Sequence, residues 1–160
     1  MMDLARLTRR AEIEALYADY AHCLDNDELE AWPDFFTEDC FYRITSAENF
    51  EAGMPIGVVY ATSRAMLVDR VMALRKANIY EPQRYRHLIG AIKMGNEQDG
   101  SVPVAANFVV ARTMQDGAMM LFAAGRYGDR LVHRDGTWKF AGKDVVLDSR
   151  RIDTLLAIPL

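Results

Sequence analysis

Apolar residues in the first part of the chain recur with the period of a helix. Spacings of three and four residues put this set on one helix face. Its members are Ile13, Leu16, Tyr17, Tyr20 and Leu24. The polar run at 25–27 ends this helix. Asp27, with Glu30 three residues on, has the form of a capping box for a second helix.

The apolar face of this second helix is short, and its segment contains a proline. It consists of Leu29, Trp32, Phe35 and Phe36. Pro33 lacks a backbone N–H and therefore predicts a break or a fresh first turn.

A strand, a loop and a third helix are predicted next. Cys40–Ile44 has the composition of a short strand, and residues 45–60 indicate a long loop that ends in a strand at Ile56–Tyr60. Thr62 or Ser63 can cap the helix that follows. Its apolar side is formed by Leu67, Val68, Val71 and Leu74.

From Tyr85 onward the pattern is that of strands joined by tight turns. The predicted strands are Tyr85–Met94, Val102–Gln115, Ala118–His133 and Trp138–Leu147. An Asp-Gly pair ends each of the three connecting segments and predicts type I′ hairpin turns. Because two of the runs are longer than an ordinary strand, we expect bends or bulges near Gly125 and Gly128.

Helices followed by an antiparallel meander define the α+β class. We predict one domain over residues 1–160: a cone in which N-terminal helices pack on a strongly curved sheet that is mixed but mainly antiparallel. The length suits a single domain with one core.

Charge and composition narrow the possible partners. The net charge is −4 and the arginines are scattered beside acids, so no basic stripe indicates nucleic acid. No apolar run is long enough to span a bilayer, and the N-terminus lacks a secretory signal, so we expect a cytoplasmic protein without a membrane partner. Cys23 and Cys40 fit reduced, buried thiols better than a disulfide framework.

Motifs for cofactors and nucleophiles are missing from the sequence. A Rieske cluster needs two closely spaced Cys–His pairs, which neither cysteine has. There is no zinc-binding pair, glycine-rich nucleotide loop or nucleophile elbow. An iron site built from two of His22, His87 and His133 plus a carboxylate stays open on sequence alone. We predict no metal, no cofactor and no catalytic residue in this chain.

One alternative is an acid–base pocket at the mouth of the cone. Its candidate residues are Tyr17, Tyr20, Asp25, Tyr42 and His87. A carboxylate, an imidazole and phenols around an apolar cavity have the chemistry of an isomerase or dehydratase. The competing interpretation, which we favour, is that the tyrosines are core residues with hydrogen-bonded hydroxyls. A ligand-binding domain is a third possibility.

Two segments suggest contacts with another protein. Arg84, Arg86 and His87 cluster at a strand start, and arginine is enriched where proteins meet. Asp148 and Arg150 begin a tail whose last six residues, 155–160, are apolar. Such a tail must be held by its own core or by a partner. These five residues are the candidate subunit interface.

Taken in order, four segments resemble the small, or beta, subunit of the aromatic-ring-hydroxylating dioxygenases. They are Glu14–Asp25, Trp32–Cys40, Arg86–Leu88 and Leu147–Leu160. The Trp-Pro-x-x-Phe-Thr-x-Asp run before a strand is the most specific of them. The family has the cone fold of the nuclear-transport-factor-2-like, or SnoaL-like, superfamily.

The resemblance implies a structural role within a larger enzyme. It implies a heterohexamer of three large (alpha) and three small subunits, with the Rieske [2Fe–2S] cluster and the mononuclear iron in the large subunit. Electrons from NADH would arrive through a reductase, with or without a ferredoxin. The size and ending are similar to those of enzymes acting on aromatic acids such as anthranilate, salicylate or terephthalate.

Overall fold

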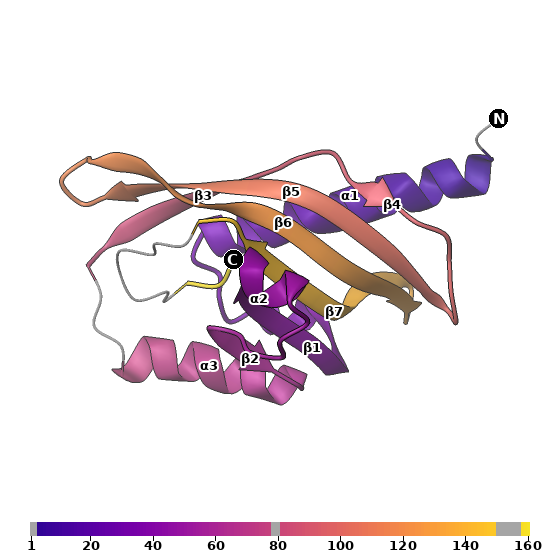
Figure 1. Cartoon of the computed structure of the whole chain (residues 1–160), viewed down its shortest axis with the longest axis horizontal. Helices are drawn as coiled ribbons and strands as arrows, with labels where there is room; N and C mark the ends of the chain where they lie inside the picture. Colours follow the sequence, from indigo (N-terminus) through magenta and orange to yellow (C-terminus); the bar gives the residue numbers. More distant parts are fainter. Residues whose placement is uncertain (1–2, 78–80, 150–157) are drawn as a thin grey trace.

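A long N-terminal helix opens the structure. The computed structural model describes residues 3–77, 81–149 and 158–160. Helix α1 (Leu4–Asp25) begins at Asp3, whose carboxylate accepts a hydrogen bond from the Ala5 N–H. The residues that it buries include Ile13, Tyr17 and Tyr20, as the helical period predicts. In Figure 1, α1 runs along one side of the sheet.

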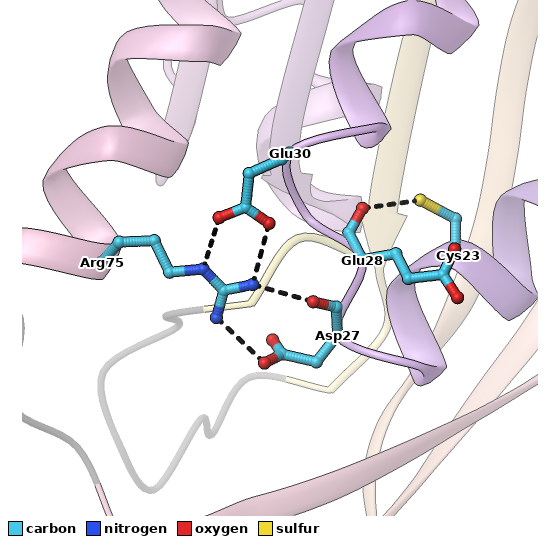
Figure 2. A network of polar contacts seen from close by, with 5 residues as sticks. All are labelled: Cys23, Asp27, Glu28, Glu30 and Arg75. Carbon is cyan, nitrogen blue, oxygen red and sulfur yellow. Dashed lines mark hydrogen bonds and ion pairs between the residues drawn. The ribbon is translucent and has the colours of Figure 1, made fainter.

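The predicted capping box is wrong, because its two acids bind a different partner. Asp27 has a positive φ of 60°, and the next element, η1 (Trp32–Phe35), is a 3₁₀ helix with no side-chain cap. Figure 2 shows Asp27 and Glu30 on two sides of the Arg75 guanidinium, which donates to Glu30 at 2.8 and 3.1 Å and to the Asp27 carboxylate at 2.9 Å. These contacts tie the loop after α1 to α3 (Arg64–Ala77).

The strands form one mixed sheet in the order β2-β1-β7-β6-β5-β3, with β4 beside β5. Only β1 and β7 pair in parallel; every other pairing in the described sheet is antiparallel. The bounds are β1 (Phe36–Ser46), β2 (Val59–Ala61), β3 (Gln83–Ile89), β4 (Lys93–Met94), β5 (Ser101–Met114), β6 (Met119–Arg134) and β7 (Thr137–Leu147). This arrangement confirms the α+β class and the mixed, mainly antiparallel sheet.

Local turn chemistry explains how the meander is connected. Asp99 and Gly100 have φ of 51° and 76°, and Asp135 and Gly136 have φ of 53° and 79°. Both pairs therefore have the two positive φ values of a type I′ turn. The third turn differs, because only Gly117 has a positive φ, of 88°.

The sheet bends less than we predicted, and at other places. It does not curl strongly: in Figure 1, β5 and β6 run side by side as long, gently bent ribbons. The register shifts leave Phe122 of β6 and Ala141 of β7 without a partner, so the bulges lie there and not at Gly125 or Gly128. A bulge puts neighbouring residues on one face, which explains why Phe122 and Ala123 are both buried.

Two further segments differ from the prediction. Residues 45–60 include a short helix, α2 (Ala47–Glu51), whose first turn is capped by Ser46. The predicted strand 85–94 is divided into β3 and β4. In α3, Ser63 is the residue that caps the first turn, at 3.3 Å from the Met66 N–H, and Val68 is exposed.

Gly125 lets β6 and β7 approach closely. A Cβ at this position would lie 2.0 Å from the Val146 carbonyl oxygen, whereas the nearest atom to a Cβ at Gly128 is 4.0 Å away. We therefore expect Gly125→Ala to lower the free energy of unfolding by more than about 2 kcal/mol, and Gly128→Ala to change it by less than about 1 kcal/mol. Urea unfolding followed by tryptophan fluorescence measures both. Equal losses would contradict the close approach.

Candidate functional site

A buried ion pair lies between α1 and the inner face of the sheet. The Lys143 ammonium of β7 donates to Asp129 Oδ2 of β6 at 2.9 Å, and both side chains are 0% exposed. The Tyr17 hydroxyl of α1 donates to the same oxygen. Three elements therefore meet at one carboxylate.

Aromatic rings surround the lysine. The Lys143 nitrogen lies 3.5 Å from the centre of the Tyr127 ring, 4.5 Å from that of Phe140 and 4.7 Å from that of Tyr20. Ring faces carry negative charge density and attract a cation, most strongly where water is excluded. The rings thus stabilise an ammonium for which, in the described part of the chain, Asp129 is the one ion-pair partner.

Burial sets the electrostatics of this cluster. Loss of water raises the pKa of the Asp129 carboxyl and lowers the pKa of the Lys143 ammonium, while their mutual attraction acts in the opposite direction. Burial, and then the neighbouring Asp129 charge, raise the pKa of Tyr17 well above its usual range. Tyr17 therefore keeps its proton and donates it in the hydrogen bond to Asp129.

The end of the chain occupies the interior beside two other tyrosines. The Leu160 carbonyl accepts hydrogen bonds from Tyr20 at 2.8 Å and from Tyr42 at 3.0 Å, and Leu160 is 0% exposed. Burial raises the pKa of both phenols. These hydroxyls are already bonded to the backbone.

Asp25 and His87 form a separate pair at the end of α1. Asp25 Oδ1 lies 2.6 Å from His87 Nδ1, and Asp25 Oδ2 accepts the His87 backbone N–H at 2.9 Å. The His87 side chain is 0% exposed, and its Nε2 has no hydrogen-bond partner among the described residues. The pair fastens α1 to β3, an edge strand of the sheet.

A hollow of about 350 Å³ lies between α1 and the segment from His87 to Ile92. Tyr17, Asp25 and His87 contribute to its walls, together with Ala18 and Ala21. Because the His87 ring has no exposed surface, a molecule in the hollow does not reach Nε2. Tyr20 and Tyr42 are not among the wall residues.

The five residues of the predicted pocket therefore divide into three groups. Tyr17 belongs to the ion-pair cluster, Tyr20 and Tyr42 hold Leu160, and Asp25 binds His87. No metal site is seen either: across residues 3–77, 81–149 and 158–160, no three His, Cys, Asp or Glu side chains are grouped so as to hold an ion. In the same residues, no helix is both long and apolar enough to cross a membrane.

Comparison with known proteins assigns the chain to a family. The family described as "Ring hydroxylating beta subunit" matches residues 20–154. The anthranilate 1,2-dioxygenase small subunit of Burkholderia cepacia is 42% identical over 93% of this chain and 92% of its own. The chain belongs to the ring-hydroxylating dioxygenase beta subunit family.

Two further relatives agree with this membership. A terephthalate 1,2-dioxygenase terminal oxygenase subunit, beta 1, of Comamonas sp. is 42% identical over 93% of this chain and 97% of its own. A structure from Novosphingobium aromaticivorans, assigned as the beta subunit of an aromatic-ring-hydroxylating dioxygenase, superposes with a TM-score of 0.89. It is 39% identical and covers 99% of this chain and 100% of its own.

In this beta subunit the candidate interface residues lie in different environments. Arg84 and Arg86 are exposed on the outer face of β3, and Asp148 is exposed after β7. His87 points to the inner face, so its side chain is not part of the exposed surface. Arg150 lies outside the described residues.

Asp129 and Lys143 are not among the residues predicted from the sequence. Along β6, Tyr127 and Leu131 point inward, and strand alternation puts Asp129 on the same face. On β7, Lys143 alternates in the same way with Val145. The sequence does contain a signal for this ion pair. Each of two neighbouring predicted strands has one charged residue of opposite sign at an inward position.

Replacing one member of the ion pair should lower the stability of the fold more than replacing both members. Lys143→Met leaves a buried carboxylate without its cation, and we expect a loss of about 3–5 kcal/mol in the free energy of unfolding. Asp129→Leu combined with Lys143→Met should lose less than the sum of the two single changes. Urea unfolding of the four proteins gives the coupling. Additive losses would show that the two charges do not interact.

The two thiols should react slowly in the folded chain. Both are free and buried, as predicted, and burial raises the pKa of Cys23 and of Cys40 to about 11. Since the thiolate is the reactive form, alkylation at pH 8 should be at least about 100-fold slower in the folded than in the unfolded chain. Mass spectrometry after timed iodoacetamide treatment measures this. Equal alkylation rates in the folded and the unfolded chain would show that the two thiols are not buried.

Proposed function

We propose that this chain is the structural small subunit of a Rieske non-haem iron aromatic-ring-hydroxylating dioxygenase. In this role it binds the catalytic large subunits in a three-plus-three heterohexamer and stabilises their assembly. The observation that carries the proposal is the 42% identity to the anthranilate 1,2-dioxygenase small subunit over 93% of the chain. That relative is described as a subunit of an oxygenase, so the role proposed here is that of a subunit.

The substrate that we propose for the whole enzyme is an aromatic acid. The support is that anthranilate and terephthalate, which appear in the names of the two relatives at 42% identity, are both aromatic carboxylates. The complete enzyme would add dioxygen to the ring with electrons from NADH, delivered by a reductase with or without a ferredoxin. We place the Rieske cluster and the mononuclear iron in the large subunit, and the assembly in the cytoplasm.

The titratable groups in the interior of this chain have structural contacts, which supports a function that the chain performs through its surface. Lys143 and Asp129 are 0% exposed and bonded to each other. The His87 ring is 0% exposed as well. Acid–base chemistry needs groups that touch a substrate. These titratable groups instead join α1 to the sheet, which is a structural task.

A stand-alone isomerase or dehydratase is the alternative. The observation in its favour is the pair formed by Asp25 and His87, whose side chains lie 2.6 Å apart, close to a hollow. The buried His87 ring weighs against it, since a substrate has no path to Nε2 without movement of the surrounding residues. This alternative requires turnover by the isolated chain.

Purification of the native complex tests the proposal. We expect this chain to co-purify, in equal number, with a larger polypeptide that holds all of the iron, in a particle whose mass fits three copies of each. Native mass spectrometry and iron analysis measure both quantities, with the separately expressed small subunit as the control. A monomer that turns over an aromatic substrate by itself, or that holds stoichiometric iron, would contradict it.

A further inference from the structure

The outer face of the β3–β5–β6 part of the sheet has a distinctive composition. Side chains alternate across a strand, so the residues opposite the buried ones form this face. Its central strip consists of small, half-buried residues: Val109 and Ala111 of β5 and Ala124 of β6. Two large apolar side chains stand on either side of the strip, Leu88 with 57% and Leu121 with 70% of its surface exposed.

The strand register joins these residues into continuous rows. Leu88 pairs with Val109, which pairs with Ala124 on its other side. In the next row, Arg86 pairs with Ala111, which pairs with Leu121. Together the two rows form an apolar strip that crosses β6, β5 and β3, and β3 is at the edge of the sheet.

Arginines border this strip on both sides. Arg84 and Arg86 are exposed on β3, and Arg126 is exposed on β6 in the row next to Ala124. Arg130 is exposed two rows further along β6, opposite Pro103. No ion pair is found for these four within the described residues, although the Arg126 guanidinium lies 5.5 Å from the centre of the Phe50 ring. The outward positions of β3, β5 and β6 hold no carboxylate. The acids at the margin are Asp148 and Asp144 of β7, which pairs with Gly128 and is held by Arg43 at 2.7 Å.

This charge arrangement contrasts with the rest of the molecule. The chain as a whole has a net charge of −4, yet this face shows four arginines and no acid. Arginine, together with large apolar residues, is typical of protein interfaces, and small residues at the centre allow a close approach of the partner. A two-fold contact between two copies of the face would set arginines against arginines, which disfavours self-pairing.

We infer that the β3–β5–β6 outer face is the surface that binds the large subunit, through a partner surface with an apolar centre and an acidic border. This inference rests on the proposed function and adds to it the location of the contact and the chemistry of the partner. It also includes Arg84 and Arg86, two of the residues that the sequence singled out.

Charge reversal on β3 tests the inference. The large subunit recovered in the native purification is co-expressed with the wild-type chain, with Arg84→Glu/Arg86→Glu, and with Leu121→Glu. The matched control is Arg6→Glu/Lys76→Glu, which makes the same change in net charge at exposed positions on α1 and α3. Circular dichroism and urea midpoints show that each variant is folded, as expected for changes to exposed side chains.

The readout is the dissociation constant for the large subunit at two salt concentrations. We expect the β3 double variant to bind on the order of 100-fold more weakly and to lose most of the salt dependence of the wild type. Leu121→Glu should also weaken binding, and the control should bind like the wild type.

Other outcomes would overturn the inference. Wild-type affinity in both β3 and Leu121 variants would place the large subunit elsewhere and leave the proposed function intact. Self-association of the wild-type chain that the β3 variant abolishes would show that a second copy occupies this face. Failure of the wild-type chain to bind any large subunit would instead refute the proposed function itself.

Discussion

A lysine and an aspartate share the inner face of the sheet without access to water, and the packing of the N-terminal helix depends on them. Desolvation of two charges is expensive, and only a close partner with further hydrogen bonds offsets it. Lys143 and Asp129 meet this condition at 2.9 Å, with the Tyr17 hydroxyl as a third partner. The contact fixes α1 against β6 and β7, because any shift of the helix would leave the Asp129 carboxylate with a partner fewer.

The same constraint organises the aromatic core around it. Tyr127, Phe140 and Tyr20 each direct a ring toward the Lys143 ammonium. Tyr20 also holds the Leu160 carbonyl through its hydroxyl, at 2.8 Å. One side chain thus connects the buried charge to the end of the chain. The buried ion pair and the end of the chain are therefore packed against the same aromatic ring.

Several features of this fold follow from short-range rules and could be predicted. The Asp135-Gly136 turn takes the two positive φ values that an Asp-Gly hairpin requires. The apolar period of α1 identified its buried face, because one side of a helix must pack. The segments typical of the beta subunits indicated the family, which the comparison then showed.

Other features depend on contacts between distant residues, which local pattern does not contain. Asp27 and Glu30 have capping-box spacing, but Arg75 of α3 binds both of them. The candidate tyrosines were correctly recognised as polar core residues, yet their partners, Asp129 and Leu160, are more than 100 positions away in the sequence. The bulges follow from register across strand pairs, so the glycines of one strand did not locate them.

The parallel pairing of β1 with β7 has a consequence for how the protein is made. Strand β1 has the weak, three-residue β2 on one side and β7 on the other, so its main neighbour is the last of the described strands to be synthesised. The N-terminal third of the nascent polypeptide, with Trp32 and Phe36, must therefore wait on the ribosome with its apolar surface uncovered. Chains that lack β7 keep this surface uncovered, and exposed apolar surface of this kind favours aggregation.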